Sequence, residues 1–434
     1  MTDWPSLLSS ARLQDSKPPM GEAQRTPFQR DFDRVAFSSH FRRLQDKTQV
    51  HPLADSDYVR RRLTHSLEVS CVARSLGTFI GRALKNRGDA ALDQMEELAA
   101  EVGQIAAAAA LAHDIGNPPF GHIGETAIAE WFETNSSNEL FKQLSPAEMA
   151  DLRLFEGNAQ GFRILVRLAN SHVGLKLTAA TLGAFTKYPT SSSARRRPGY
   201  IGQKKHGFFC AESTEFAKLA WTLGLRSLTE GSWQRHPLAF LVEAADDICY
   251  RIIDVEDGVK VGRIEYRDAE ACLRALLPGN VSYNPSVDDK DSNLGWLRAT
   301  AIGNLIEIVQ QVFLENEASI VNGEFGTSLI EGSPLASAVE DAKKLVEERV
   351  FKWDRTIRAE ISGVKMLHSL LDDFINAAAA PQKASGKKLL AIVPGYDLRA
   401  APYEQLLSIT DFISGMTDSY LVETYQQVHG VAVP

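Results

Sequence analysis

The sequence predicts a mainly α-helical fold with at most short strands. Apolar residues recur at helical spacing over most of the 434 residues, and polar or proline-containing breaks divide them into a few long blocks. The alanine-rich run from Ile105 to Ala112 has high helix propensity and is apolar throughout, so it indicates a buried helix. A hydrophobic content of 44% supports a large core.

The N-terminal residues 1–27 contain four prolines and show no clear hydrophobic period. We expect this segment to form an arm that is either mobile or draped over the body. Helical patterns then run from about residue 31 to residue 188.

The stretch from Pro189 to Gly207 is polar, basic and glycine-containing, which indicates a loop. Its basic residues include Arg195, Arg196 and Arg197. Three interpretations stay open at this point: a lid over phosphates, a patch for DNA, or a plain solvated insertion.

A second helical block spans about residues 212–316. The stretch from Gly323 to Pro334 breaks the helical pattern, which then resumes toward the C-terminus. A further break lies between Pro381 and Pro394, and its apolar run Leu389–Val393 is expected to form a short strand.

Composition argues against several classes of protein. The net charge of -8 disfavours a general nucleic-acid binder, so an anionic substrate would have to be attracted by local cations. The four cysteines form no CxxC pair, which argues against a zinc ribbon or a disulfide framework. Without a long apolar run or a signal-peptide pattern, the sequence predicts a soluble cytoplasmic protein. It also lacks the glycine-rich phosphate loop of Walker-type NTPases.

The pair His113-Asp114 is the most informative chemical feature. Neighbouring residues point about 100° apart on a regular helix, so two neighbours converge on one ion only near a helix end. Gly116, Pro118 and Pro119 follow the pair and supply such an end. Imidazole and carboxylate together suit Mn, Fe, Co, Zn or Mg rather than a thiolate-binding ion.

Two other segments offer candidate ligands. His65 lies on an amphipathic segment, where a half-buried histidine without a metal is the alternative interpretation. Residues 238–254 carry a polar stripe made of Glu243, either Asp246 or Asp247, Tyr250 and Asp254. A solvated face would explain these carboxylates equally well. Apolar residues nevertheless cover most of this helix, and carboxylates on a buried helix need a metal or a cation as partner.

In this order, His65, His113-Asp114 and Asp246 resemble the H…HD…D signature of the HD phosphohydrolase superfamily. The chain resembles most closely the bacterial dGTPase, or deoxynucleoside triphosphate triphosphohydrolase, group. Five segments carry this resemblance: Phe41–Val50, His113–Glu125, Phe155–Gly161, Ala245–Tyr250 and Ser414–Asp418. The resemblance covers nearly the whole chain and implies a multi-helix HD-domain fold with a helical C-terminal extension.

The resemblance also implies a reaction. Members of this group hydrolyse a dNTP to the deoxynucleoside and inorganic tripolyphosphate, with water attacking the α-phosphorus. A divalent metal (Mn, Mg, Fe or Co) would be held by His65, His113, Asp114 and Asp246. His122 and Glu125 would be the catalytic acid/base pair, and their spacing of three puts both on one face of the helix expected after Pro119.

Substrate contacts follow from the same resemblance. Gln45, Tyr250 and Asp254 would read the deoxyribose, because polar groups take the 3′-hydroxyl and the tyrosine ring excludes a ribose 2′-hydroxyl. Five further positions would contact the rest of the substrate, chiefly its triphosphate: Arg62, Asn117, Lys187, Tyr188 and Lys205. For each single lysine, a surface cation without such a role is the alternative.

Two positions differ from the vertebrate branch of the superfamily. Asn117 stands where that branch carries a histidine, and Asp247 stands where it carries a lysine. Both agree with the bacterial branch, so the vertebrate phosphate contacts and nucleotide-driven activation do not transfer. Base preference among dNTPs is not encoded in any motif of this chain.

After the N-terminal arm (1–27), the resemblance implies an HD-type catalytic core (28–275) and a helical C-terminal region (276–434). The last would complete the site and make oligomer contacts. A homo-oligomer, hexameric in the family, is implied, with dNTP as substrate, single-stranded DNA as a candidate partner and no membrane. Two alternatives stay open: another HD-type phosphomonoesterase or phosphodiesterase, and a regulatory or single-stranded-DNA-binding HD protein.

Overall fold

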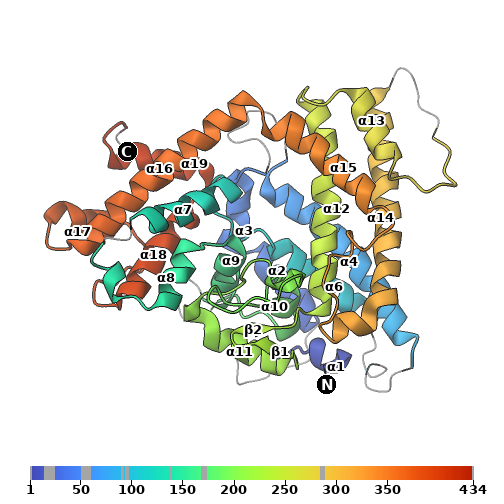
Figure 1. The fold of residues 1–434 in the computed structure, drawn as a ribbon, viewed down its shortest axis with the longest axis horizontal. Helices are drawn as coiled ribbons and strands as arrows, with labels where there is room; N and C mark the ends of the chain where they lie inside the picture. Colours follow the sequence, from blue (N-terminus) through green and yellow to red (C-terminus); the bar gives the residue numbers. More distant parts are fainter. Residues whose placement is uncertain are drawn as a thin grey trace.

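The computed structural model describes residues 2–13, 25–49, 60–88, 92, 97–135, 138–167, 174–283 and 289–432. Within these ranges the protein is built almost entirely of packed helices, which confirms the predicted fold class (Figure 1). The one sheet among the described residues is a small antiparallel pair, β1 (Ser227–Thr229) with β2 (Ser232–Trp233).

The helices, in chain order, are α1 (Trp4–Leu7), α2 (Pro27–Ala36), α3 (Ser39–Arg43), α4 (Arg62–Lys85), α6 (Leu98–Ala112), α7 (His122–Thr134), α8 (Pro146–Arg153), α9 (Gly157–Val166), α10 (Ala179–Phe185), α11 (Ser213–Thr222), α12 (Pro237–Lys260), α13 (Tyr266–Arg274), α14 (Lys290–Val321), α15 (Ala336–Val346), α16 (Asp354–Ala379), α17 (Ala384–Leu390), α18 (Pro402–Ser414) and α19 (Asp418–Val428). None of the described helices combines the length and the apolar character that crossing a membrane requires.

The larger hydrophobic core forms around α4, α6 and α12. Leu76 of α4 and Ile248 of α12 are fully buried in it, together with the alanine-rich run that the sequence predicted to be a buried helix. Small residues let α4 and α6 pack backbone to backbone. A Cβ added at Gly77 would lie 2.7 Å from the carbonyl oxygen of Val102, so a larger residue there would push the helices apart.

A second, smaller core joins α7 and α8 to the C-terminal helices α16, α18 and α19, on the left of Figure 1. Ile128 and Phe132 of α7 pack in it with Leu371 and Phe374 of α16 and with Ile409 of α18. Helices far apart in the chain therefore share one core. The larger core, in turn, includes α14 and α15.

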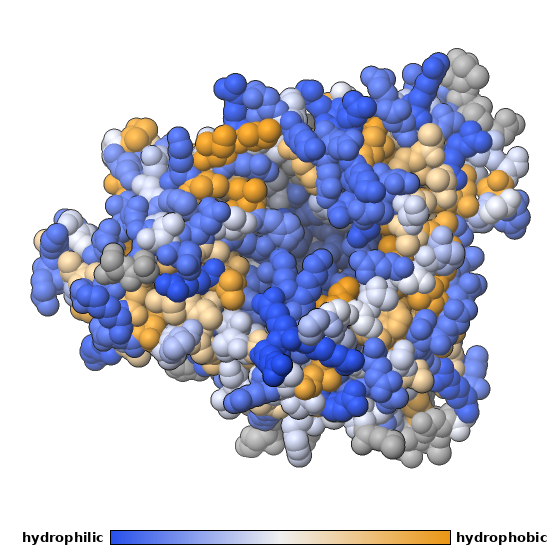
Figure 2. Space-filling model, in the orientation of Figure 1, coloured by the Kyte–Doolittle hydropathy of each residue, from blue (hydrophilic) through white to orange (hydrophobic). Residues whose placement is uncertain are grey.

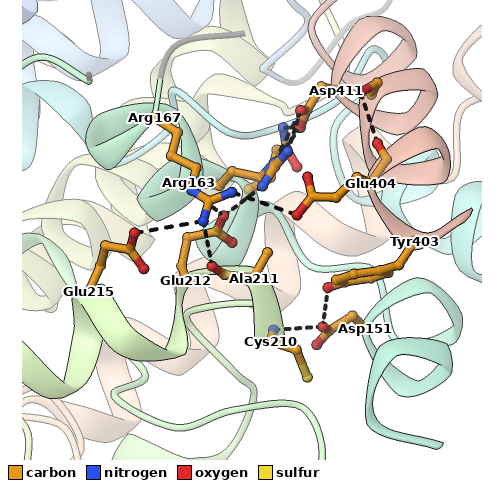
Figure 3. Close-up of polar contacts among 12 residues, drawn as sticks. Asp151, Arg163, Arg167, Cys210, Ala211, Glu212, Glu215, Tyr403, Glu404 and Asp411 are labelled. Atoms are coloured by element: carbon orange, nitrogen blue, oxygen red, sulfur yellow. Dashed lines mark hydrogen bonds and ion pairs between the residues drawn. The ribbon is translucent and has the colours of Figure 1, made fainter. Parts of the chain in front are cut away.

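A buried ion-pair network joins the two cores (Figure 3). Arg163 of α9 binds Glu212 with an Nη1–Oε1 distance of 2.6 Å and Asp411 of α18 with an Nε–Oδ1 distance of 2.9 Å. Nearby, the hydroxyl of Tyr403 on α18 donates a hydrogen bond to Asp151 of α8. Because buried charges require partners, these contacts fix how α9 and α18 lie against each other.

The described part of the N-terminal arm is draped over the body. Trp4 and Leu7 of α1 are buried, and the indole of Trp4 donates to Glu317 of α14 at 2.8 Å. The remainder of the expected arm includes residues 14–24, which lie outside the described residues.

The prediction of a strand at residues 389–393 is wrong. Leu389 and Leu390 end α17, and the next residues continue in turns, with the amide of Val393 donating to the carbonyl of Leu390. Leu390 and Val393 are buried in the second core at a spacing of three. The apolar run is therefore one face of a helical turn, which a five-residue window does not distinguish from a strand.

The basic stretch 189–207 is a loop, as predicted, apart from a 3-10 turn at Ile201–Gln203. Thr190 and His206 at its two ends are buried, whereas Arg195–Arg197 at its tip are exposed. The ends of the loop are thus part of the body, whereas its tip and Lys204 are solvated. The predicted break at 323–334 is also confirmed, since it lies between α14 and α15.

Candidate active site

Three predicted ligands from three helices converge at one point. His65 lies in the first turn of α4, His113 caps the end of α6 and Asp246 lies on α12; one ligand atom from each lies within 4.8 Å of the other two. The Nε2 atoms of His65 and His113 are 3.1 Å and 3.6 Å from Oδ1 of Asp246. Among the residues that the structure describes, this is the one group of this kind suited to a metal ion.

The fourth predicted ligand, Asp114, lies beside this group. Its Oδ1 is 3.4 Å from Nε2 of His113, and its side chain receives hydrogen bonds from Arg62 (Nη1 to Oδ2, 2.7 Å) and from Asn117. Burial alone would raise the pKa of Asp114, but the charge of Arg62, followed by those of His113 and His65, lowers it to about 2. Asp114 is therefore an oriented carboxylate at neutral pH.

The donor atoms fit a divalent metal ion. Nδ1 of His113 lies 2.7 Å from the carbonyl oxygen of Ala110, which can only accept, so Nδ1 carries the proton and Nε2 keeps its lone pair for a ligand bond. Two imidazole nitrogens and two carboxylates form a set that Mn, Fe, Co, Zn and Mg all accept.

The turn after α6 packs closely against α9, and only a residue without a side chain fits at the point of closest contact. A Cβ on Gly116 would lie 2.1 Å from the amide nitrogen of Gly161 and 2.2 Å from the carbonyl oxygen of Gly157, both in α9. Further along, Phe120 has a φ of 62°, which costs a non-glycine residue about 1–2 kcal/mol. Its amide donates to Asp418 at 3.0 Å, so a residue of α19 stabilises this strained turn.

The predicted acid/base pair lies at the start of α7. Nδ1 of His122 is 2.7 Å from Oε2 of Glu125, and the other oxygen of Glu125 accepts the amide of Gly157 at 2.8 Å. The side chain of His122 is 77% exposed, whereas that of Glu125 is 8% exposed. Burial by itself raises the pKa of Glu125, but the hydrogen bond and charge of His122, and then Lys205, lower it. An accessible imidazole is thus held by a buried carboxylate.

Figure 2 shows a hollow lined by hydrophilic residues in the middle of this face, between the surface over α16 and the surface over α12. The two helices belong to different cores. The seam between the cores is therefore open to solvent on this side.

The predicted triphosphate contacts are held by carboxylates in this structure. Nζ of Lys187 lies 3.4 Å from Oε1 of Glu243, and Nζ of Lys205 lies 2.9 Å from Oε2 of Glu156. Tyr188 is buried. Their contacts with a triphosphate stay a prediction.

The predicted sugar contacts are not brought together by any hydrogen bond between the described residues. Tyr250 is half-buried on α12, with its ring centroid 6.4 Å from that of Phe351. Asp254 lies one turn further on, where burial raises its pKa well above the ordinary value and its Oδ2 has no hydrogen-bond partner. Gln45 is exposed in a 3-10 turn.

Sequence reasoning missed three charged residues around the site: Lys47, Glu156 and Asp418. Lys47 is buried, and its Nζ donates hydrogen bonds to the carbonyl oxygens of Asn117 and Ser414. These two hydrogen bonds join the turn after α6 to the end of α18. Each missed residue lies inside a segment on which the family resemblance rests. That membership was the available signal, but it carried no indication of which residues would meet.

Comparisons with known proteins identify the family of this chain. The HD domain family matches residues 62–199, which hold His65, the His113-Asp114 pair and the His122/Glu125 pair. A deoxyguanosinetriphosphate triphosphohydrolase-like protein of Synechocystis is 41% identical over 99% of this chain and 100% of the relative. A protein of the same description from Pseudomonas aeruginosa is 38% identical over the full length of both chains. The deoxyguanosinetriphosphate triphosphohydrolase of Yersinia enterocolitica is 30% identical over 92% of this chain and 93% of its own. The chain therefore belongs to the deoxyguanosinetriphosphate triphosphohydrolase family, a family of HD-domain hydrolases.

Proposed function

We propose that this enzyme hydrolyses deoxynucleoside triphosphates, dGTP among them, to the deoxynucleoside and inorganic tripolyphosphate. Two observations support the proposal: an accessible imidazole, His122, held by a carboxylate, and a convergent group of side chains that could hold a metal ion. The two parts are linked through Arg62, which binds Asp114 and whose guanidinium packs against Gly121, the residue before His122.

His65, His113, Asp114 and Asp246 would hold a divalent cation such as Mn, Mg, Fe or Co. When bound, such a cation supplies a Lewis acid for an α-phosphate oxygen and makes water a stronger nucleophile at neutral pH. The chain itself keeps the ligands aimed: the carbonyl of Ala110 orients His113, and Arg62 orients Asp114.

His122 would act on the leaving group. As the oxygen of water bonds to the α-phosphorus, the bond from that phosphorus to O5′ breaks, and the resulting 5′-alkoxide is a poor leaving group. His122 donates a proton to O5′ while Glu125 stabilises the protonated imidazole at Nδ1. General acid catalysis of this kind is worth about 10²–10⁴-fold in rate.

Substrate selection would come from the residues around this centre. The ring of Tyr250 would pack against C2′, and Gln45 and Asp254 would hold the 3′-hydroxyl; the unpartnered Oδ2 of Asp254 supports its part. Lys187 and Tyr188 would contact the triphosphate, since Lys187 is paired with Glu243 one turn before Asp246 on α12.

We further propose two kinds of partner. Family membership supports a homo-oligomer, a hexamer, in which the C-terminal region makes subunit contacts; light scattering of the purified protein measures this, and a monomer would contradict it. The exposed tip Arg195–Arg197 supports binding of single-stranded DNA. Replacing the three arginines by serine should weaken the binding of a fluorescently labelled DNA single strand. An unchanged affinity would contradict the proposal that single-stranded DNA is a partner.

Product analysis tests the proposed reaction. The purified protein is incubated with each dNTP in turn and with Mn, Mg, Fe or Co, and the products are separated by anion-exchange chromatography. Deoxynucleoside and tripolyphosphate are expected in equal amounts. Orthophosphate or a mononucleotide would instead identify another HD-type phosphohydrolase, and no product from any combination would refute the proposed activity.

A further inference from the structure

Lys205 is shared by two buried carboxylates. Its ammonium nitrogen lies 3.0 Å and 2.9 Å from the two oxygens of Glu156 and 3.8 Å from Oε2 of Glu125. Both glutamate side chains are 8% exposed. Two carboxylates this deeply buried require a cation between them, and Lys205 is placed to supply it.

Glu156 is built into the same turn that holds Glu125. It is the N-cap residue of α9, its Oε1 accepts the side-chain amide of Asn158 at 2.7 Å, and the next amide, that of Gly157, donates to Glu125. A Cβ on Gly157 would lie 2.4 Å from Oε1 of Glu125, so only glycine permits this approach. One turn of chain therefore positions both the lysine and the carboxylate that orients His122.

The electrostatic interactions of Glu156 and Lys205 also indicate that Lys205 balances the charges of both carboxylates. Burial is the largest cause that raises the pKa of Glu156, followed by the negative charge of Glu125, while Lys205 opposes both. Burial would lower the pKa of Lys205, but Glu125 and then Glu156 outweigh it and raise the pKa. The titratable and charged groups that face Glu125 are His122 on the same helix, Glu156, Arg62, Lys205 and His206, and burial lowers the pKa of His206 to about 3.

We propose that Glu156 and Lys205 are positioning residues for the acid/base pair. Glu156 anchors the ammonium group, and the ammonium group balances the two carboxylates so that Glu125 stays ionised and aimed at His122. This assignment rests on the proposed function, because turnover has to depend on His122 and Glu125. The alternative role for Lys205 is the triphosphate contact expected from the sequence.

Steady-state kinetics of Lys205→Met separate the two roles. A positioning role predicts a fall in kcat of about tenfold or more with little change in KM for dGTP, since the transition-state proton donor is disturbed rather than ground-state binding. The acid limb of the kcat–pH profile should also move upward by about one unit, because Glu125 loses its balancing cation. A rise in KM at unchanged kcat would show that Lys205 binds the triphosphate and would overturn the proposal.

The double variant Lys205→Met/Glu156→Gln gives the sharper test. Removing Glu156's charge as well relieves the repulsion that Lys205→Met leaves between two buried carboxylates. It should therefore recover part of the lost kcat and move the acid limb back, which is a coupling between the two sites. Glu156→Gln alone is measured for comparison. If the fall in kcat of the double variant equals the product of the falls in the two single variants, and the acid limb does not move back, the shared-charge role is refuted.

Lys142→Met serves as the matched control. Lys142 pairs with Glu139 on the surface, with exposed fractions of 61% and 75%, so the same change there should leave kcat and the pH profile unaltered. Metal content and thermal unfolding are measured for every variant, so that a folding defect is recognised. A wild-type enzyme inactive on every dNTP would refute the proposed function, whereas an active wild type with an unaltered Lys205→Met profile would refute this inference alone.

Discussion

The two halves of the site lie on different cores. The proposed metal-binding half consists of side chains from α4, the end of α6 and α12, which share the larger core, and its candidate ligand His65 is 2% exposed. The acid/base half begins α7, which packs with α16 and α18 in the second core, and its His122 is 77% exposed. The first half is fixed by deep packing, whereas the second is oriented by a few hydrogen bonds across the seam.

The difference shows where this site is vulnerable. The second half reaches the first only if the cores stay closed on each other, and specific polar contacts hold them closed. Lys47 binds the carbonyl oxygens of Asn117 and Ser414, while Asp418 accepts from the amides of Thr48 and Phe120. The C-terminal helices therefore support the turn that joins the candidate metal ligands to His122.

The largest expected effect comes from the metal-binding half. Asp114→Ala removes an anionic ligand and leaves the buried guanidinium of Arg62 without its partner. Bound metal and turnover should both be lost, while circular dichroism still reports a helical protein. Elemental analysis measures the metal, and full stoichiometry in this variant would remove Asp114 from the ligand set.

The acid/base half should respond differently. His122→Ala removes an exposed side chain, so thermal stability and metal content should stay unchanged while kcat falls by about two orders of magnitude or more. The measurement pairs elemental analysis with steady-state kinetics on dGTP. Loss of metal would make His122 a ligand, and full activity would give it no role in the chemistry.

The seam can be broken at Lys47. Lys47→Met leaves two buried carbonyl oxygens without their donor, which should lower the free energy of unfolding by about 1–3 kcal/mol. Urea unfolding at neutral pH measures the loss. Lys142→Met, on the surface, is the control and should change stability little.

The same variant tests how the contribution of Lys47 to the free energy of unfolding depends on pH. Burial lowers the pKa of Lys47 from 10.5 to about 7, so between these values the unfolded chain binds more protons than the folded one. The contribution of Lys47 to wild-type stability should therefore rise with pH from about 7 to 10.5, and the stability difference between wild type and Lys47→Met should grow across that window. A difference independent of pH would show that Lys47 stays charged when buried.

The smallest expected effect concerns the sugar. If the ring of Tyr250 excludes a 2′-hydroxyl, the wild type should have a higher kcat/KM for dGTP than for GTP. Tyr250→Ala should reduce the ratio of these two values by about tenfold, mainly by raising kcat/KM for GTP. Equal wild-type values for dGTP and GTP would defeat the steric argument. 2′,3′-Dideoxy-GTP used as well as dGTP would remove Gln45 and Asp254 from the proposed site.

Helix positions and the candidate metal ligands could be predicted because both depend on local pattern. The alanine-rich run, the glycine and prolines after it and the apolar circumference of residues 238–254 predicted where α6 ends and that α12 is buried. His65, His113, Asp114 and Asp246 followed from the order of a short signature. The strand expected at Leu389–Val393 failed for the same reason: five apolar residues carry too little periodicity to separate a strand from a helical turn.

The sequence by itself determined the helical class, the family and the residue types at the centre. Only the tertiary structure decided which residues meet: that α7 packs with α16 and α18, that Lys47 is buried against Asn117 and Ser414, and that Glu156 and Glu125 share Lys205. Helix propensity and side-chain period act over a few residues, so the sequence displays them directly. Partners of a buried charge are set by which surfaces pack together, and these surfaces can come from segments far apart in the chain, as the separation of 367 residues between Lys47 and Ser414 shows.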